Sequence, residues 1–277
     1  MKIKRILIIG GDARIEELAN LLTEDGYEVS SYDGNGTLKS AVEASDAVVL
    51  GLPGSRDDKC IDAPKLDKPI LIKDLFQLMG NKRLLLAGKM SESMKAVADV
   101  FNVKWIDYFM RDEFEVANAV PTCEGAIQIA MEELPVTLHG SNVVVTGYGR
   151  IGRILSNDLK SLGANVTVCA RKPEARALAR ADAHDSMPFS ELPGLCENAD
   201  VVFNTVPQVV IDRRALVRCK NTLIIDLASK PGGVDFDAAR DLGVKVIWAL
   251  GLPGKVAPVS AGKIIKETIC NIFSEMG

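Results

Sequence analysis

The sequence predicts an α/β protein with two doubly wound parallel-sheet domains that face one another across a cleft. First, short β-branched and aliphatic runs alternate with helical patterns along the whole chain, which is typical of parallel sheets covered by helices. Second, the run 142–146 leads through Gly147-Tyr-Gly-Arg-Ile-Gly152 into an amphipathic segment. Third, the two halves of the chain share a short sequence pattern, because residues 46–54 are similar to residues 200–207 and 251–254. We therefore expect two Rossmann-like domains.

The first domain is expected to span residues 1–121 and to hold the substrate or a partner. Its predicted strands are residues 4–10, 27–32, 46–51, 69–72, 83–87 and 103–106, with helical patterns at 12–22, 75–79 and 91–101. The first turn has only two glycines, Gly10 and Gly11, and the acidic Asp12 stands where a phosphate would lie. Asp12 is instead a plausible helix N-cap. We expect this domain to bind no dinucleotide.

Two helices are expected to pack at the hinge between the domains. Residues 122–134 form an amphipathic crossover helix that begins after Pro121 and ends at Pro135. Thr122 could cap this helix, with Glu124 in its first turn. The second helix is the C-terminal segment 260–277.

The second domain is expected to span residues 140–259 and to bind a dinucleotide. Its predicted strands are residues 142–146, 165–169, 200–204, 222–226 and 245–249. A G-x-G-x-x-G string carries meaning when it lies between a strand and a helix, as it does here. The first glycine makes the turn, the second admits a pyrophosphate and the third lets the helix pack on the strand. The predicted contacts are Gly147, Tyr148, Gly149, Arg150, Ile151 and Gly152.

The residues after the strand 165–169 favour NADP over NAD. An NAD site usually has Asp or Glu here to bind the ribose hydroxyl. This chain has Arg171 and Lys172 instead, and two cations suit a 2′-phosphate. The alternative is that both are solvated loop charges.

Further cofactor contacts are expected where the next strands end, since ligands bind beyond the carboxyl ends of parallel strands. Near the ribose or adenine we expect Asn204, Thr205, Val206 and Pro207, and near the nicotinamide Ala228 and Ser229. Lys230 lies in the same small-residue loop and could bind a substrate carboxylate or a developing negative charge; the alternative is an ordinary surface lysine.

Composition argues against several other classes of function. The chain has 277 residues, a net charge of −4 and 25% charged residues, so nucleic acid and anionic membranes are poor default partners. It has no apolar run long enough for a membrane span. The six cysteines form no C-x-x-C pair, which suits reduced thiols in a cytoplasmic protein, and two isolated histidines argue against a metal site.

Four strings give the sequence a specific resemblance. They are Val120-Pro-Thr-Cys-Glu-Gly-Ala126, His139-Gly-Ser-Asn-Val143 with the glycine motif after it, Ile225-Asp-Leu-Ala-Ser-Lys-Pro-Gly-Gly233 and Gly251-Leu-Pro-Gly-Lys-Val-Ala-Pro258. In order and spacing the chain closely resembles the family of dipicolinate synthase A subunits of endospore-forming bacteria. The resemblance implies oxidation of dihydrodipicolinate, or its hydrated precursor, to dipicolinate during sporulation. It also implies NADP as hydride acceptor, a small dicarboxylate substrate and, as partner, the flavoprotein-like B subunit of dipicolinate synthase. A homo-oligomer is expected.

Candidate catalytic residues accompany this resemblance. Arg56 and Arg111 could bind substrate carboxylates, or form exposed ion pairs, and Glu124 could be the base or merely a cap. Hydroxyacid dehydrogenases, which share the layout more distantly, carry a catalytic His in the cofactor domain, and neither His139 nor His184 is comparable. Two alternatives stay open: a dehydrogenase of another small hydroxy or amino acid, and a regulatory protein that binds NADP without catalysis.

Overall fold

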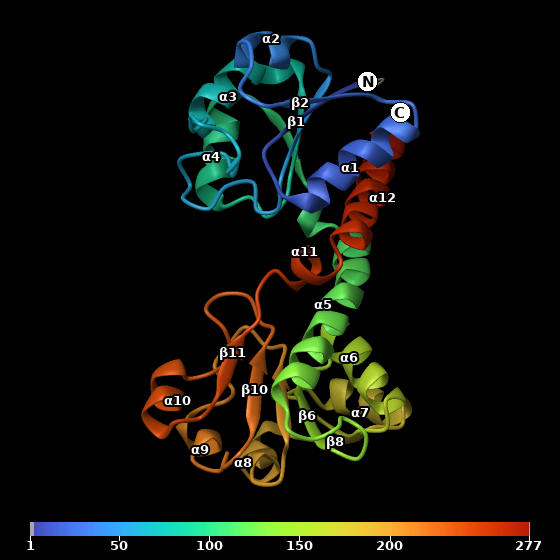
Figure 1. The fold of residues 1–277 in the computed structure, drawn as a ribbon, viewed down its shortest axis with the longest axis vertical. Coiled ribbons are helices and arrows are strands. Elements are labelled where there is room, and N and C mark those ends of the chain that lie inside the picture. The colour runs from blue at the N-terminus through green and yellow to red at the C-terminus, as the bar shows by residue number, and fades with distance from the viewer. Residues whose placement is uncertain (1–2, 277) are drawn as a thin grey trace. The chain divides into compact units, whose positions relative to one another are not determined.

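The computed structural model describes residues 3–276, which divide into two compact units (Figure 1). Unit 1 contains the chain up to Asn118 and the segment from Ala257 onward, and unit 2 spans Ala119–Val256. Both units are parallel α/β structures, as the sequence predicts.

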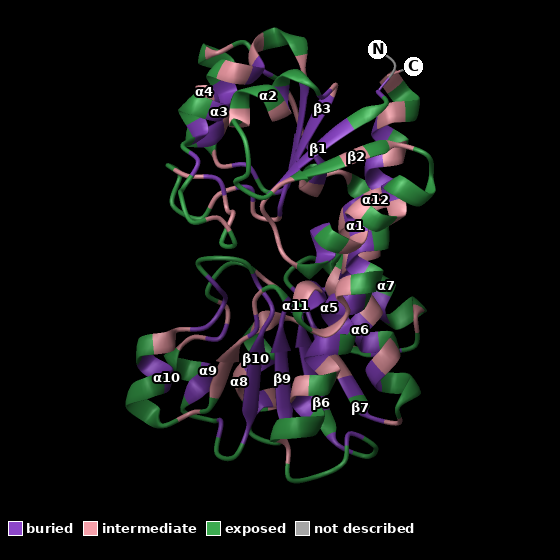
Figure 2. Cartoon of the chain, turned by 45° about the horizontal axis from the view of Figure 1, so that its top comes forward, coloured by how far each residue is buried: buried purple, intermediate pink, exposed green. Residues whose placement is uncertain are grey.

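The sheet of unit 1 has five parallel strands in the order β2-β1-β3-β4-β5. Their bounds are β1 Arg5–Ile9, β2 Glu28–Tyr32, β3 Ala47–Leu50, β4 Leu84–Ala87 and β5 Lys104–Asp107. All residues of β3 and β4, and four of the five in β1, are buried, because helices cover both faces of the sheet (Figure 2).

The helices of unit 1 form two apolar cores, one on each face of the sheet. They are α1 Ala13–Glu24, α2 Leu38–Glu43, α3 Ile72–Met79, α4 Glu92–Val100 and α12 Pro258–Met276. Ile265 and Ile269 of α12 join Leu18 of α1 in one core. The two helices approach closely at Gly262, where a methyl group would lie 2.8 Å from the Arg14 carbonyl oxygen. The C-terminal helix thus belongs to unit 1, and residue 277 of its predicted span lies outside the described residues.

The sheet of unit 2 has six parallel strands in the order β11-β10-β9-β6-β7-β8. The strands are β6 Asn142–Thr146, β7 Asn165–Cys169, β8 Asp185–Met187, β9 Val201–Asn204, β10 Leu223–Asp226 and β11 Val246–Trp248. The helices are α6 Arg150–Ser161, α7 Pro173–Ala181, α8 Leu192–Cys196, α9 Arg213–Leu216, α10 Phe236–Leu242 and α11 Leu252–Val256. Read from β8, this is the strand order 3-2-1-4-5-6 of dinucleotide-binding domains, with the switch point between β6 and β9.

Helix α5 corrects the prediction of a crossover helix over 122–134. It spans Asp112–Glu133 and contains Pro121 in its interior. Three acidic residues favour a helix start at its first turn, and buried residues on both sides of the proline, Ala119 and Cys123, hold the helix together through it. Thr122 is therefore not an N-cap, and Glu124 lies in the middle of a helix.

The predicted strand 69–72 is also wrong. Leu71 makes only an isolated bridge with Cys60, and Ile72 already begins α3. A four-residue apolar run is too short to distinguish a short strand from the first turn of a helix by its sequence pattern. The other ten predicted strands are found, and β8, which the sequence did not reveal, completes the second sheet.

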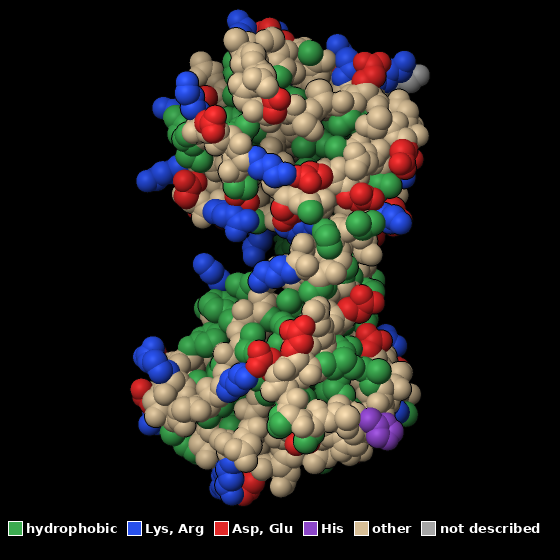
Figure 3. Space-filling view, in the orientation of Figure 1, with side chains coloured by type: hydrophobic (Ala, Val, Ile, Leu, Met, Phe, Trp, Pro, Cys, Tyr) green, Lys and Arg blue, Asp and Glu red, His purple; other side chains and the backbone are tan. Residues whose placement is uncertain are grey.

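The surface is mixed in charge. Lysine, arginine and acidic side chains are interspersed on the visible face of each unit (Figure 3). Between residues 3 and 276, no helix combines the length and the apolar character that a membrane span requires.

Candidate dinucleotide site

The turn between β6 and α6 has the form of a phosphate cradle. Gly147 has φ +90°, and a Cβ there would lie 2.4 Å from Oγ1 of Thr205. A Cβ at Gly152 would lie 2.3 Å from the Gly147 carbonyl oxygen, whereas one at Gly149 would meet no heavy atom within 4 Å. The first and third glycines are thus required by the fold itself, and the second leaves open space beside the backbone.

The open space lies at the start of α6. Gly149 is the N-cap residue and has no side chain to accept a hydrogen bond from the first turn. The first amides of a helix lack intrahelical partners, and together with the helix dipole they favour a phosphate. Arg150 is exposed in this turn, and Ile151 packs partly into the core of unit 2.

Tyr148 points into the protein rather than toward a ligand. Its side chain packs with Val168 and Ala170, and its hydroxyl donates a hydrogen bond of 2.8 Å to the Asp182 carboxylate. Burial, and then this hydrogen bond, raise the pKa of Tyr148. Because Tyr148 is only 8% exposed, its predicted contact with the cofactor would involve its backbone and not its side chain.

The end of β7 carries an exposed group of cations. In the described chain, neither Arg171 nor Lys172 has a side-chain hydrogen bond or ion pair, and both are exposed. Nη1 of Arg176 donates to the Ala170 and Arg171 carbonyl oxygens at 2.8 Å, and so fixes the backbone of this turn. Sequence reasoning missed Arg176, whose position in the first turn of α7 was the available signal.

A buried polar network joins three strand ends at the switch point. Oδ1 of Asn204 accepts a hydrogen bond from Thr146 Oγ1 at 2.6 Å, and its Nδ2 donates to Asp226 Oδ1 at 2.7 Å. Both Asn204 and Asp226 are completely buried. The side-chain amide of Asn204 is therefore enclosed and already bonded, which argues against the predicted contact with the ribose. It positions the loop after β9 instead, since Nδ2 also donates to the Val206 carbonyl oxygen at 3.0 Å.

The loops after β9 and β10 present the remaining predicted contacts. Thr205 and Val206 are half-buried, and Pro207 is exposed. Ala228 is buried, whereas Ser229 and Lys230 are exposed.

Asp226 holds the second of these loops at both ends. Its carboxylate accepts from the Ala228 amide at 3.0 Å and from the Gly233 amide at 2.8 Å. The residues between these two anchors include Lys230. A buried carboxylate thus fixes the backbone that carries an exposed cation.

Glu124 lies in a different environment from the one predicted. It is exposed on α5, and its negative charge, after burial, is the second cause that raises the pKa of Asp158 on α6. The site that the sequence placed at a helix N-terminus does not exist, since α5 already begins at Asp112.

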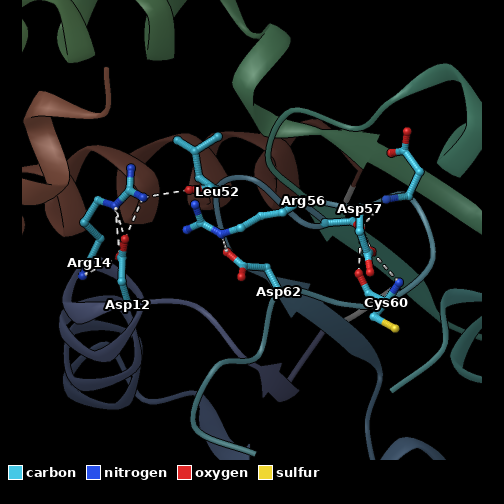
Figure 4. A network of polar contacts seen from close by, with 9 residues as sticks. Asp12, Arg14, Leu52, Arg56, Asp57, Cys60 and Asp62 are labelled. Atoms are coloured by element: carbon cyan, nitrogen blue, oxygen red, sulfur yellow. Dashed lines mark hydrogen bonds and ion pairs between the residues drawn. The ribbon is translucent and has the colours of Figure 1, made fainter. Parts of the chain in front are cut away.

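The arginines proposed as carboxylate binders in unit 1 are already paired. Arg56 Nε lies 2.9 Å from Asp62 Oδ2 (Figure 4). Arg111 contacts Glu113 at 2.8 Å and Glu275 at 2.5 Å, and the hydrogen bond to Glu275 is the first cause that raises its pKa. These ion pairs support the alternative reading of both arginines, in which they form ion pairs rather than bind a substrate carboxylate.

The turn after β1 is closed against a pyrophosphate. The Gly11 amide donates to the Asp62 carbonyl oxygen at 3.0 Å, and a Cβ at Gly10 would lie 2.3 Å from the same oxygen. Beside it, Arg14 forms a salt bridge of 2.7 Å with Asp12 and donates to the Leu52 carbonyl oxygen (Figure 4). Within residues 3–276 no group of three or more His, Cys, Asp or Glu side chains could hold a metal ion.

Comparison with known proteins gives consistent matches for both units. Residues 5–109 match the family model of the N-terminal domain of the dipicolinate synthase A subunit. Residues 90–238 match the model described as D-isomer specific 2-hydroxyacid dehydrogenase, NAD binding domain.

Relatives match over nearly the full length. The dipicolinate synthase A subunit of Bacillus subtilis (strain 168) is 31% identical over 98% of this chain and 96% of its own. The crystal structure of its counterpart from Bacillus halodurans matches with a TM-score of 0.90 and 28% identity, covering 98% of both chains. The A chain of dipicolinate synthase from Bacillus subtilis gives a TM-score of 0.89 at 27% identity, covering 100% of this chain and 97% of that one.

Proposed function

We propose, since this chain belongs to the family of dipicolinate synthase A subunits, that it is an NADP-dependent oxidoreductase that oxidises dihydrodipicolinate, or its hydrated precursor, to dipicolinate. Membership of the family and the nicotinamide-binding domain make it an oxidoreductase of the dehydrogenase type. The substrate and the choice of NADP are our proposals.

The observation that carries the proposal is the turn at Gly147–Gly152. Two of its glycines are required by the fold, and Gly149 alone is open, beside the first amides of α6. Such a turn fits a pyrophosphate approaching the backbone.

Preference for NADP is supported by the end of β7. Arg171 and Lys172 are exposed cations without acidic partners in the described chain, and Arg176 fixes the turn that carries them. A 2′-phosphate would supply an anion for them, whereas an NAD site would place a carboxylate here. Val206, Pro207 and the backbone of Ala228 and Ser229 are proposed as further contacts.

The chain's own groups have defined tasks in this reaction. When bound, oxidised NADP supplies a hydride acceptor, and aromatisation of the ring leaves one proton to be removed. Lys230, on the backbone held by Asp226, is proposed to bind a substrate carboxylate. Glu124 is the proposed proton acceptor, since it is an exposed carboxylate in unit 2.

The biological setting follows from the family. An A subunit implies a B subunit as partner, which we propose to be flavoprotein-like, and we propose that the complex acts in the cytoplasm of sporulating cells. A homo-oligomer of this chain is part of the same proposal.

The direct test supplies the purified chain with freshly generated product of dihydrodipicolinate synthase and NADP, with and without the B subunit. NADPH, followed by its absorbance, and dipicolinate, followed by chromatography, should form in equal amounts. Lys230→Gln should slow the reaction. The matched control is Lys220→Gln, because Lys220 is an exposed lysine before the amino end of the same strand.

Two results would contradict the proposal. If the chain, with the B subunit present, reduced NADP with another hydroxy or amino acid but not with this substrate, the substrate assignment would be wrong. If the chain without the B subunit bound NADPH but turned over no substrate, and Lys230→Gln left the activity of the complex with the B subunit unchanged, the chain would be a regulatory protein.

A further inference from the structure

Unit 1 carries four cationic side chains within six residues of the carboxyl ends of its strands, namely Arg14, Arg56, Lys89 and Arg111. Each of the three arginines forms an ion pair with an acidic side chain. The N–O distances are 2.7 Å for Arg14, 2.9 Å for Arg56 and 2.5 Å for Arg111. Lys89 differs from them, because none of the residues that the structure describes gives its ammonium a carboxylate partner. Ligands of parallel sheets bind at this edge.

The backbone at Lys89 is held in a conformation that a lysine rarely adopts. Its φ is +55°, in the left-handed region. The amides of Lys89 and Met90 donate to the two oxygens of the Asp107 carboxylate, at 2.8 and 2.7 Å. Asp107 is only 6% exposed. Strained residues of this kind persist where the surrounding structure fixes them, often at ligand sites.

The Asp107 carboxylate also positions Phe109, whose ring lies beneath the Lys89 side chain. The Phe109 amide donates to Asp107 Oδ1 at 3.0 Å, and the Lys89 Nζ lies 5.9 Å from the centre of the Phe109 ring. The lysine is exposed, so its ammonium remains available to an anion from solution.

The loop after β3 is tied to this position. The Gly54 amide donates to the Gly88 carbonyl oxygen at 2.9 Å, and the Gly88 amide donates to the Gly51 carbonyl oxygen at 3.2 Å. A Cβ at Gly88 would lie 2.8 Å from Leu52 and Tyr108 atoms. The lysine is therefore presented from a closely packed strand end rather than from a loose loop.

We infer that Lys89 binds one carboxylate of the dicarboxylate substrate, as a specificity-determining cation at the strand ends of unit 1. This inference rests on the proposed function for the identity of the substrate. It replaces Arg56 and Arg111, which the sequence singled out, with a cation that has no acidic partner among the described residues.

The test measures dipicolinate binding by calorimetry in the presence of NADPH, apart from turnover. Lys89→Gln should weaken binding by ~10- to 100-fold, the loss expected for one charge-assisted hydrogen bond. Lys89→Arg should retain much of the affinity. The matched control is Lys95→Gln, because Lys95 also lies over an aromatic ring, Trp105 at 5.8 Å, but already pairs with Glu92.

Two further measurements separate binding from a structural role. Lys89→Gly should raise the melting temperature by ~2–4 °C, since glycine accepts a positive φ, and yet lose dipicolinate affinity as Lys89→Gln does. Picolinate, with one carboxylate, should bind the wild type more weakly than dipicolinate does, and this discrimination should collapse in Lys89→Gln.

Unchanged dipicolinate affinity in Lys89→Gln would overturn the inference while leaving the proposed function intact. Equal losses for dipicolinate and picolinate would overturn it as well. A wild-type chain that binds dipicolinate through Lys89 but makes none from its precursor would instead count against the proposed function alone.

Discussion

The three glycines of the β6–α6 turn illustrate how one residue type serves different purposes. Gly147 needs a positive φ, and Gly152 needs the space that a backbone oxygen occupies 2.3 Å from its missing Cβ. Gly149 has neither constraint. We therefore propose that Gly149 serves a ligand rather than the fold.

This difference predicts opposite results for two alanine variants. Gly152→Ala should destabilise unit 2 by about 1–3 kcal/mol, because the new methyl group overlaps backbone that cannot move aside. Gly149→Ala should leave stability unchanged within about 0.5 kcal/mol but weaken NADPH binding at least about tenfold. Denaturant unfolding and NADPH fluorescence titration check the pair. Loss of stability in Gly149→Ala, with affinity retained, would contradict the assignment.

Asp46 contributes to the response of unit 1 stability to acid. The Arg5 guanidinium, which donates to its carboxylate at 2.6 Å, is the first cause that lowers the pKa of Asp46 to about 2. The ordinary value in an unfolded chain is about 3.9. A carboxyl whose pKa is lower in the folded state stabilises the fold above its unfolded pKa, and this contribution disappears as pH falls through its folded pKa.

Asp46→Asn should accordingly lower the free energy of unfolding by about 1–2 kcal/mol at pH 7. The difference from wild type should shrink between about pH 4 and pH 2, where the native carboxylate becomes protonated. Urea unfolding at a series of pH values measures it. A difference that stayed constant down to pH 2 would show that the ion pair with Arg5 is not its source.

The loop after β10 depends on a single buried acid. Asp226 accepts one side-chain and two backbone hydrogen bonds, from Asn204, Ala228 and Gly233. All three partners are N–H donors. If position 226 carried an amide, its own NH₂ group would replace one carboxylate oxygen and face at least one of these N–H groups, so that two donors would meet without an acceptor.

Asp226→Asn should therefore destabilise unit 2 by about 2–4 kcal/mol and free the loop that carries Lys230. Amide hydrogen exchange at Gly233 should accelerate more than exchange in β6, which checks that the effect is local. Uniform acceleration throughout unit 2 would indicate global destabilisation and contradict a specific role in holding this loop.

Elements with strong local signals were predictable, and elements defined by tertiary contacts were not. The glycine motif and the buried runs of β6 and β9 correctly predicted the two strands and the strand–turn–helix unit of the candidate dinucleotide site. The start of α5 was missed because Pro121 was read as a helix boundary, although the acidic first turn at 112–115 marks the true start. The short strand β8, Asp185–Met187, has a polar sequence, and only its pairing with β7 makes it a strand.

The roles of individual site residues were harder to predict, because exposure and pairing depend on the fold. Arg171, Lys172 and Lys230 are exposed, as a ligand contact requires. Asn204 is enclosed and Arg111 is paired with Glu275, and neither fact can be read from the sequence. Lys89 was overlooked because its distinctive backbone depends on Asp107, 18 residues away in the sequence.

At the level of the whole chain, the two units differ at their first strand–helix turn. Unit 2 has the strand order of a dinucleotide-binding domain and an open cradle at its switch point. Unit 1 is also a parallel sheet with helices on both faces, but it has five strands in a different order, and its first turn is covered by the Asp62 backbone and lies beside the Asp12–Arg14 ion pair. We therefore expect unit 2 to bind the coenzyme and unit 1 to bind the substrate.

The most direct test of this account is an equilibrium titration of the chain with NADPH and NADH. Wild type should bind NADPH at least about tenfold more tightly, the value of one good charged contact to the 2′-phosphate. Arg171→Asp should abolish that preference while leaving NADH affinity nearly unchanged. A wild-type chain that binds neither coenzyme, or that prefers NADH regardless of the residue at position 171, would contradict the account.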